Sequence, residues 1–333
     1  MNTRNASRRN YLVTGGAGFI GSHLCERLLS TGNSVTVLDD LSTGRYENVA
    51  QLEGTEGFRL IIDTVTNEKM VADLVSGADA VFHLASAVGV ELIMDQPVRT
   101  IETIVLGTHV VLAQARRYRK RVLLTSTSEV YGKSQDVPFH EDGDRLEGAT
   151  TRHRWAYATA KALDEFLALA HWKETRLPVV CVRLFNTVGP RQTGQYGMVL
   201  PKFVEAAKAG TPLYVYGDGQ QSRCFCHVLD VVEALTRLID TPAAAGRVFN
   251  VGSQEEITMH QLAQLVKQRL ASSSDIVFRT YEEVFGSEGF EDMRRRVPDL
   301  TRIGEAVGWT PTRNLNEIID DVARNVAVAA RPR

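Results

Sequence analysis

A glycine-rich segment near the N-terminus constrains the fold of this 333-residue chain more than any other feature. It follows an apolar segment at 11–14, typical of a buried strand, and precedes a segment at 21–31 whose leucines have helical spacing. A strand, a glycine turn and a helix form the context of a dinucleotide site: Gly15 permits the tight turn, Gly18 lets the backbone approach a pyrophosphate, and Gly21 lets the helix pack on the strand. The helix N-terminus then offers free N–H groups to the phosphates. The contacts expected from this segment are Gly15, Gly18, Phe19 and Ile20.

The end of the next strand indicates which dinucleotide is bound. The apolar segment 34–39 ends in Asp39, about 20 residues after the glycines. A carboxylate there accepts hydrogen bonds from the adenosine ribose hydroxyls and repels a 2′-phosphate. The sequence therefore predicts NAD and not NADP; the alternative for Asp39 is a helix cap or a turn residue.

The order of strand and helix patterns predicts the fold class. Helical patterns at 21–31, 66–76, 97–119 and 155–175 alternate with six apolar strand candidates, and this alternation favours a Rossmann-type, doubly wound parallel α/β sheet. We expect residues 9–185 to form the NAD-binding domain with the catalytic residues, and residues 186–325 to form mainly a smaller, interleaved α/β lobe for the substrate. The strand candidates are 11–14, 34–39, 58–62, 80–84, 121–126 and 178–184.

Composition excludes several classes of function. Hydrophobic residues make up 44% of the chain and the formal net charge is −2, so neither a nucleic-acid partner nor a membrane surface is indicated. No run of 18 apolar residues is present, and the four cysteines lack metal-ligand spacing. We therefore expect a cytoplasmic protein without a metal site.

A tyrosine and a lysine within one helical pattern are the candidate catalytic pair. Tyr157 and Lys161 are four positions apart and share a helix face. A nearby ammonium lowers the pKa of a phenol, which lets Tyr157 exchange the proton of a sugar hydroxyl while hydride moves to NAD. Thr127, after the buried strand at 121–126, can hydrogen-bond the reacting oxygen. Glu129 follows two residues later and is expected at the mouth of the same site. The alternatives are a half-buried tyrosine with a solvated lysine, and an exposed loop acid at Glu129.

Together these motifs resemble the extended short-chain dehydrogenase/reductases, the NAD-dependent nucleotide-sugar epimerase/dehydratase group, over about residues 9–325. The matching motifs are Thr14-Gly-Gly-Ala-Gly-Phe-Ile-Gly21, Asp39-Asp-Leu-Ser-Thr-Gly44, His83-Leu-Ala85, Ser126-Thr-Ser-Glu-Val-Tyr-Gly132, Tyr157-x-x-x-Lys161, Arg183-Leu-Phe-Asn-Thr-Val-Gly-Pro190, Val215-Tyr-Gly-Asp-Gly219, Arg223-x-Phe225 and His227-Val-x-Asp230. One departure is Ile104, where the family usually carries an asparagine that braces the catalytic strand.

The resemblance implies roles for further residues and a homodimer built on the helices at 97–119 and 155–175. Besides the residues already named, the expected NAD contacts are Ser42, Thr43, Gly44, Asp63, Leu84, Ala85, Ser86, Thr125, Tyr157 and Lys161. The expected UDP-sugar contacts are Asn186, Thr187, Arg191, Leu200, Phe203, Val215, Tyr216, Arg223 and one arginine of the run 294–296, taken as Arg295.

The most detailed prediction from the sequence concerns the reaction. Members of the group oxidise carbon 4 of the sugar and differ in the fate of the 4-keto intermediate. The catalytic segment Thr127-Ser128-Glu129 resembles that of UDP-glucuronate decarboxylases and GDP-mannose dehydratases, whereas the residues between Tyr157 and Lys161 differ from the usual decarboxylase pattern. We expect 4-epimerisation of UDP-glucuronate to UDP-galacturonate, as in an actinobacterial branch of antibiotic-sugar pathways of the moenomycin type. The alternatives are UDP-glucuronate decarboxylase, nucleotide-sugar 4,6-dehydratase and a non-catalytic NAD-binding regulator.

Overall fold

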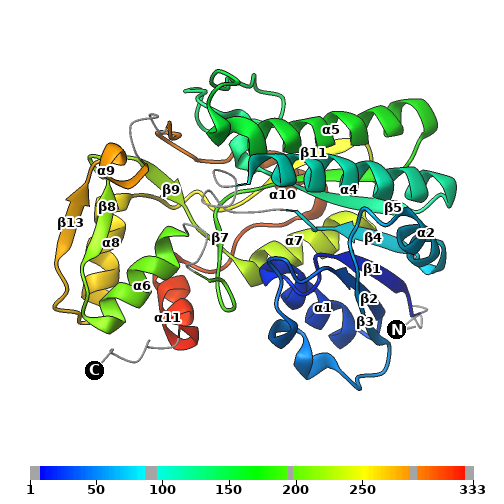
Figure 1. Cartoon of the computed structure of the whole chain (residues 1–333), viewed down its shortest axis with the longest axis horizontal. Helices are drawn as coiled ribbons and strands as arrows, with labels where there is room; N and C mark the ends of the chain where they lie inside the picture. Colours follow the sequence, from blue (N-terminus) through cyan, green and yellow to red (C-terminus); the bar gives the residue numbers. More distant parts are fainter. Residues whose placement is uncertain (1–7, 87–95, 194–197, 286–290, 327–333) are drawn as a thin grey trace.

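A seven-stranded parallel sheet forms the centre of the protein (Figure 1). The computed structural model describes residues 8–86, 96–193, 198–285 and 291–326. The strand order is β11-β6-β5-β4-β1-β2-β3, so the chain reverses its direction of winding between β1 and β4. The strands are β1 (Asn10–Thr14), β2 (Ser34–Asp39), β3 (Phe58–Ile62), β4 (Ala80–His83), β5 (Arg121–Thr127), β6 (Val179–Leu184) and β11 (Arg247–Val251).

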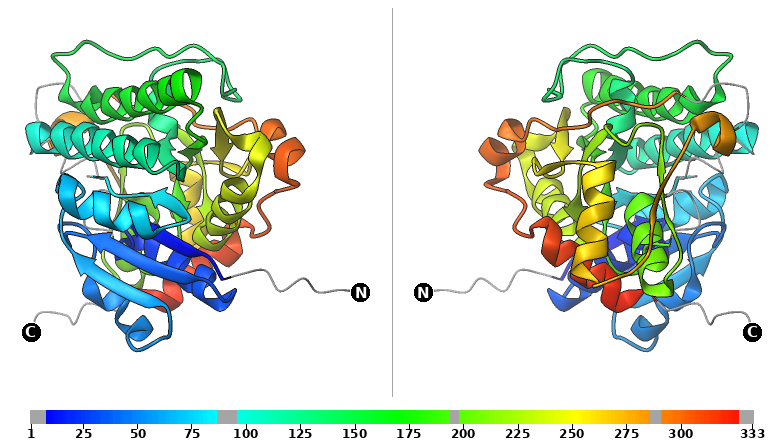
Figure 2. Two further views of the ribbon diagram at one scale, coloured as in Figure 1. Left: turned by 90° about the vertical axis from the view of Figure 1, so that its right-hand side faces the viewer. Right: turned by 90° about the vertical axis from the view of Figure 1, so that its left-hand side faces the viewer.

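Helices cover both faces of this sheet, which is why its central strands are near-continuous runs of Val, Leu, Ile and Phe (Figures 1 and 2). One face packs on α1 (Phe19–Ser30), α7 (Val228–Asp240) and α10 (Thr301–Val307). The other face packs on α2 (Glu68–Gly77), α4 (Pro97–Arg117) and α5 (Ala156–Thr175). Short 3₁₀ helices at Tyr46–Asn48, Ala50–Leu52, Ser128–Tyr131, His153–Trp155 and Pro242–Ala244 complete this part.

A second lobe with its own apolar core lies beside the carboxyl ends of the strands (Figure 1). Its three small sheets pair β7 (Thr187–Val188) with β10 (Cys226–His227), β8 (Leu213–Tyr216) with β13 (Ile276–Arg279), and β9 (Ser222–Cys224) with β12 (Glu256–Thr258). Its helices are α6 (Val199–Ala209), α8 (Met259–Arg269), α9 (Tyr281–Phe285) and α11 (Leu315–Asn325).

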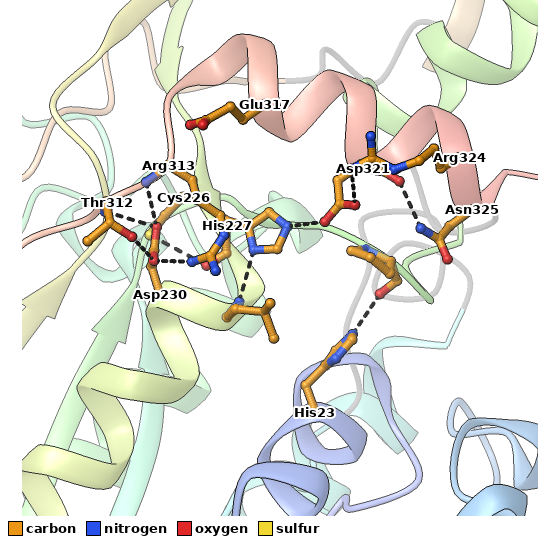
Figure 3. A network of polar contacts seen from close by, with 12 residues as sticks. His23, Cys226, His227, Asp230, Thr312, Arg313, Glu317, Asp321, Arg324 and Asn325 are labelled. Atoms are coloured by element: carbon orange, nitrogen blue, oxygen red, sulfur yellow. Dashed lines mark hydrogen bonds and ion pairs between the residues drawn. The ribbon is translucent and has the colours of Figure 1, made fainter.

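Buried polar side chains join the two parts (Figure 3). His227 accepts a hydrogen bond from the Leu229 amide at 3.1 Å and contacts the Asp321 carboxylate of α11 at 2.9 Å through its other ring nitrogen. The Asp230 carboxylate accepts from the backbone and side chains of Thr312 and Arg313. These contacts fix α11 of the second lobe to α7, which packs on the main sheet.

The predicted fold class is confirmed, and the six predicted strands all form. The prediction missed β11, which belongs to the main sheet although it lies beyond residue 185. It pairs with β6 from Arg247↔Val180 to Val251↔Leu184, so the second part of the chain also contributes to the main sheet. Among the described residues, no helix is long and apolar enough to span a membrane.

Candidate active site

A cavity of about 1180 Å³ lies between the carboxyl ends of the sheet and the second lobe. Its position beside the β1–β4 switch point is the usual ligand position in an open parallel sheet. Its volume is above the upper end of the usual range for small-molecule binding sites, which is roughly 1000 Å³. All expected cofactor contacts line it, namely Gly15, Gly18, Phe19, Ile20, Asp39, Ser42, Thr43, Gly44, Asp63, Leu84, Ala85, Ser86, Thr125, Tyr157 and Lys161.

The glycine turn fits a bound dinucleotide. Gly15 has φ +73°, and a Cβ atom there would lie 2.7 Å from the Ala85 backbone nitrogen. A Cβ at Gly21 would lie 2.2 Å from the Gly15 carbonyl oxygen, so the turn and the start of α1 close only with glycine at both positions. The N-cap residue, Gly18, provides no side-chain cap, and the first residues of α1 line the cavity. The helix start is therefore available to phosphate oxygens.

Asp39 is held rigidly at the cavity wall. Its carboxylate accepts hydrogen bonds from the amides of Ala17 and Leu41, each at 2.9 Å. Burial raises the pKa of Asp39, and the two amides oppose that rise. A Cβ atom at Gly44 would come within 2.7 Å of the same carboxylate, so the Gly44 backbone closes over Asp39. The turn interpretation of Asp39 and the ribose interpretation are thus compatible, because one carboxylate has lone pairs for both.

Tyr157 and Lys161 both line the cavity from the first two turns of α5, and Thr127 lines it from the end of β5. The expected lowering of the Tyr157 pKa is wrong for this structure. Burial raises that pKa, with a further rise from Glu129 and Asp164, while the Ser86 and Thr127 hydroxyls oppose it. The main physical reason is the burial of the phenol, while the Lys161 ammonium is itself paired with the Asp164 carboxylate at 2.8 Å.

Ile104, which replaces the usual asparagine, is buried and packs with Tyr157 and Ala160. It supplies an apolar wall for the phenol ring and offers no hydrogen bond. This contact adds to the burial of Tyr157.

Glu129 lies between two buried arginines. Arg154 Nη1 is 2.6 Å from Glu129 Oε2, and Arg296 Nη2 is 3.2 Å from Glu129 Oε1. Burial opposes ionisation of Glu129, but the two guanidinium groups outweigh it and lower the pKa to about 2. Burial lowers the pKa of Arg296 to about 10, which still leaves it charged near neutral pH. All three line the cavity, and as a cluster they carry one net positive charge.

Sequence reasoning placed Glu129 at the cavity mouth but did not find its partners. Arg154 lies in the 3₁₀ helix before α5, and nothing in its spacing relative to Glu129 indicated the contact. Because both Glu129 oxygens are occupied by guanidinium groups, the alternative of an exposed loop acid is wrong.

The choice of Arg295 as the diphosphate arginine is wrong. Arg295 is half exposed, forms two 2.8 Å contacts with Glu256 and does not line the cavity. Its neighbour Arg296 lines the cavity and donates to the Asn186 side-chain oxygen at 3.0 Å. The three consecutive arginines belong to an irregular segment, so neither helix nor strand periodicity indicates which one points inward.

Two other expected residues lie behind the cavity wall. Ser128 is fully buried and does not line the cavity, because the 3₁₀ helix that begins there turns its side chain into the protein. Arg223 is buried and donates to Asp292 at 2.8 Å; Asp292 lines the cavity and Arg223 does not. Arg223 therefore supports a lining residue, whereas the buried Ser128 hydroxyl has no hydrogen-bond partner among the described residues.

The remaining expected substrate residues line the cavity. They are Asn186, Thr187, Arg191, Leu200, Phe203, Val215 and Tyr216. Arg191 pairs with Glu26 at 2.5 Å and donates to Ser22 at 3.1 Å, so it lies against α1 on the cofactor side. The prediction missed Gln221, Tyr281 and Asp292, which also line the second lobe's part of the cavity.

Comparison with known proteins agrees with this geometry. Residues 12–322 match the family described as GDP-mannose 4,6 dehydratase. The chain belongs to this family. It is 42% identical over 305 residues to a UDP-N-acetyl-alpha-D-glucosaminuronate decarboxylase of Bacillus cytotoxicus, covering 91% of this chain and 93% of the relative. It is 36% identical to UDP-glucuronic acid decarboxylase 1 of Xenopus tropicalis, covering 93% of this chain and 70% of that relative.

Among solved structures, a UDP-glucose 4-epimerase of Thermus thermophilus in complex with NAD superposes with a TM-score of 0.82. The identity is 27%, over 95% of this chain and 98% of that one. This member of the extended short-chain dehydrogenase/reductases therefore shares its fold with a 4-epimerase, while decarboxylases are more similar to it in sequence.

Proposed function

We propose that this protein is a cytoplasmic, NAD-dependent decarboxylase of a UDP-hexuronate that acts through a 4-keto intermediate. The similarity to two decarboxylases along nearly the whole chain favours this reaction over the 4-epimerisation expected from the sequence. The relatives' names differ in the sugar, so UDP-glucuronate and UDP-N-acetylglucosaminuronate are both candidate substrates. A role in an antibiotic pathway stays a prediction from sequence.

The observation that carries the substrate class is the Arg154–Glu129–Arg296 cluster. A neutral hexose needs no positive charge beside its ring, whereas a hexuronate carries a carboxylate that must be bound in a partly dehydrated cavity. The cluster's one net positive charge, next to Tyr157, meets this need. An unpaired Glu129 would repel the substrate carboxylate, but Glu129 is already paired with both arginines.

The chemistry is divided among the cofactor and a few side chains. Bound NAD would be held by the glycine turn, Asp39 and Lys161, and would accept and later return the hydride of sugar carbon 4. The Tyr157 hydroxyl exchanges the proton of the carbon 4 oxygen, and Thr127 orients that oxygen. Loss of carbon dioxide from the 4-keto acid breaks the bond between carbon 5 and the carboxylate carbon, and its electron pair moves to the carbon 4 oxygen. Carbon 5 then takes up a proton from solvent, which restores the ketone at carbon 4, and Tyr157 returns its proton to the carbon 4 oxygen when that carbon is reduced.

The charge cluster also explains why the carboxylate can leave. Glu129 accepts from one Nη nitrogen of each guanidinium group, at 2.6 and 3.2 Å. The substrate carboxylate would therefore be attracted to the cluster while Glu129 competes with it for the arginine donors. Its bond to carbon 5 remains able to align with the ketone π system.

Product analysis tests the proposal directly. The protein is incubated with NAD and, separately, UDP-glucuronate, UDP-N-acetylglucosaminuronate and UDP-glucose, and products and carbon dioxide are measured by NMR and gas release. We expect a UDP-pentose product with stoichiometric carbon dioxide from one of the two uronates and no turnover of UDP-glucose. A UDP-galacturonate-type product without carbon dioxide would overturn the decarboxylase proposal in favour of 4-epimerisation. The absence of turnover with every substrate would favour the NAD-binding regulator.

Two neighbouring arginines provide a matched pair of variants. Arg296→Met removes a cavity cation, whereas Arg295→Met removes the exposed partner of Glu256 just outside it. We expect the first to reduce turnover by at least 100-fold, the size of one lost charge-assisted contact in a transition state, and the second to change it less than about three-fold. Equal effects would show that the cavity charge is not used.

We also propose a homodimer. The outer faces of α4 and α5 expose Val98, Ile101, Leu106, Leu163 and Phe166, of which Val98 and Phe166 are 68% and 65% exposed. Large apolar side chains gathered on two adjacent helices are typical of a protein interface. Light scattering should give twice the chain mass, and Phe166→Glu should give a monomer; a wild-type monomer at micromolar concentration would contradict the proposal.

A further inference from the structure

The catalytic lysine forms an ion pair that the proposed reaction does not explain. Lys161 Nζ and Asp164 Oδ2 are 2.8 Å apart, and both side chains are almost fully buried. Burying two charges is costly, and such a pair contributes little net stability compared with an apolar pair of equal volume. The position of this pair, beside Tyr157 and at the cavity wall, indicates a use in the site itself.

A chain of buried polar side chains leads from the cofactor turn to this pair. Thr14, the last residue of β1, has its hydroxyl oxygen 2.7 Å from His83 Nδ1. His83 Nε2 is 3.1 Å from the Thr108 hydroxyl oxygen of α4. The Thr108 hydroxyl faces the Asp164 carboxylate and favours its ionised form. The other carboxylate oxygen, Oδ1, is buried and forms no hydrogen bond of good geometry with the described residues.

The protonation of this chain follows from its chemistry. Burial lowers the pKa of His83 to about 3, with a further decrease from Lys161, so the imidazole is neutral and has one N–H. The Ala85 amide donates to the Thr14 hydroxyl oxygen at 3.3 Å. In the Nε2–H tautomer of His83, Thr14 donates to Nδ1 and Nε2–H donates to the Thr108 oxygen, which leaves the Thr108 hydroxyl hydrogen for the Asp164 carboxylate that it faces. Burial raises the pKa of Asp164, and the Lys161 ammonium and the Thr108 hydroxyl both oppose that rise.

We infer that Asp164 is a positioning and charge-balancing residue for Lys161, with the buried Thr14–His83–Thr108 chain packed behind it as support; this inference rests on the proposed use of Tyr157 and Lys161 in catalysis. Asp164 fixes the direction of one of the three Lys161 donors and leaves the others for the cavity. It also balances the charge of Lys161, so that the Lys161–Asp164 pair adds no net charge beside Tyr157.

The charges that face the phenol show what this neutrality does. Tyr157 is influenced by Glu129 from the 3₁₀ helix after β5, by Arg154 from the one before α5, and by Asp164 from its own helix. His83 of β4 faces Lys161 and is neutral. Removing the Asp164 charge therefore leaves the Tyr157–Lys161 pair more positive. The Tyr157 phenol then ionises at a lower pH, because the Asp164 charge is one of the causes that raise its pKa.

Asp164→Asn tests the inference, because asparagine keeps the shape and removes the charge. We expect the acid limb of the pH profile of kcat/KM to move about one unit toward acid, the lower end of the effect of a neighbouring charge, with KM for the UDP-sugar changed less than about two-fold. A purely structural Asp164 would lower the melting temperature without moving the limb. An unmoved limb in a folded variant would overturn the inference.

Variants of Thr108 provide a second test of the inference that does not depend on the folding of Asp164→Asn. Thr108→Val removes the hydroxyl that faces Asp164 at nearly constant volume, whereas Thr108→Ser keeps it. We expect the valine variant to move the limb in the same direction as Asp164→Asn by a smaller amount, and the serine variant to restore the wild-type profile. A wild-type profile for Thr108→Val would show that the chain does not support Asp164.

A readout that needs no substrate separates this inference from the proposed function. The ultraviolet difference between each protein and its Tyr157→Phe counterpart reports ionisation of Tyr157 alone. Titration of this difference should show Tyr157 ionising at lower pH in Asp164→Asn than in wild type. If no UDP-sugar is turned over but this shift is present, the proposed function fails and the inference stands; if turnover is present without the shift, the inference fails.

Discussion

Glu129→Gln is the substitution whose effect can be worked most directly from the structure. The two arginines hold the pKa of Glu129 at about 2, against an ordinary value of 4.5. A difference of about 2.5 units corresponds to roughly 3 kcal/mol of stabilisation of the folded state near pH 7. Because the folded-state pKa is depressed, this contribution is fully present above the unfolded-state value and is lost as the pH falls through the folded-state value. Glutamine keeps the volume but removes the negative charge that Arg154 and Arg296 share.

The expected result is a stability gap that depends on pH. Wild type should exceed Glu129→Gln by about 3 kcal/mol near pH 7 and by only about 2 kcal/mol near pH 3.5, since the wild-type carboxylate itself becomes less favoured there. Urea unfolding followed by fluorescence at both pH values measures the gap. Glu305→Gln, on the exposed face of α10, is the control and should change stability by less than about 0.5 kcal/mol. A gap that is the same at both pH values would refute the reasoning, because it would assign the loss to packing and not to charge.

Three further predictions concern residues that line the cavity or the glycine turn. Tyr157→Phe should retain NAD binding and reduce turnover by roughly two to four orders of magnitude; near-normal turnover would exclude Tyr157 as the proton carrier. Fluorescence titration should show tighter binding of NADH than of NADPH, and Asp39→Ala should reduce the difference between the two dissociation constants. A wild-type protein that prefers NADPH would refute the assignment of Asp39. Gly21→Ala should abolish NADH binding or lower the melting temperature by many degrees, because its Cβ would lie 2.2 Å from a backbone oxygen, while Gly77→Ala meets no atom within 4 Å and serves as the control.

The sheet and the residues that line the glycine-turn side of the cavity were predictable because the relevant signals are local. Each apolar run at 34–39 or 121–126 forms a strand whatever lies elsewhere, and parallel winding then brings the strand ends together. Asp39 and the glycine turn are close in the chain to the elements that place them. In contrast, β11 pairs with β6 across more than sixty residues, and its five residues include Arg247 and Asn250, so its place in the sheet had no local signal.

The site residues that were missed or misassigned depend on contacts between distant segments. Arg296 reaches Glu129 from an irregular segment, where the inward direction is set by tertiary packing alone. Arg154 meets Glu129 because a 3₁₀ helix precedes α5, and that local geometry has no distinctive residue pattern. Asp164, in contrast, follows Lys161 at helical i+3 spacing, so its contact was readable from the sequence.

The pairing of β11 with β6 has a consequence for how this protein can be divided. A chain cut after residue 185 would lose β11 and leave one side of β6 as a bare sheet edge, because the N–H and C=O groups between Val180 and Leu184 that point toward β11 would lose their partners. Such an apolar edge invites pairing with other chains, so a fragment of this kind would be expected to aggregate in expression trials. Although all the expected cofactor contacts precede residue 185, the part of the chain before this residue is not a separable module. Recombination with a related enzyme would have to exchange β11 together with the strand it covers.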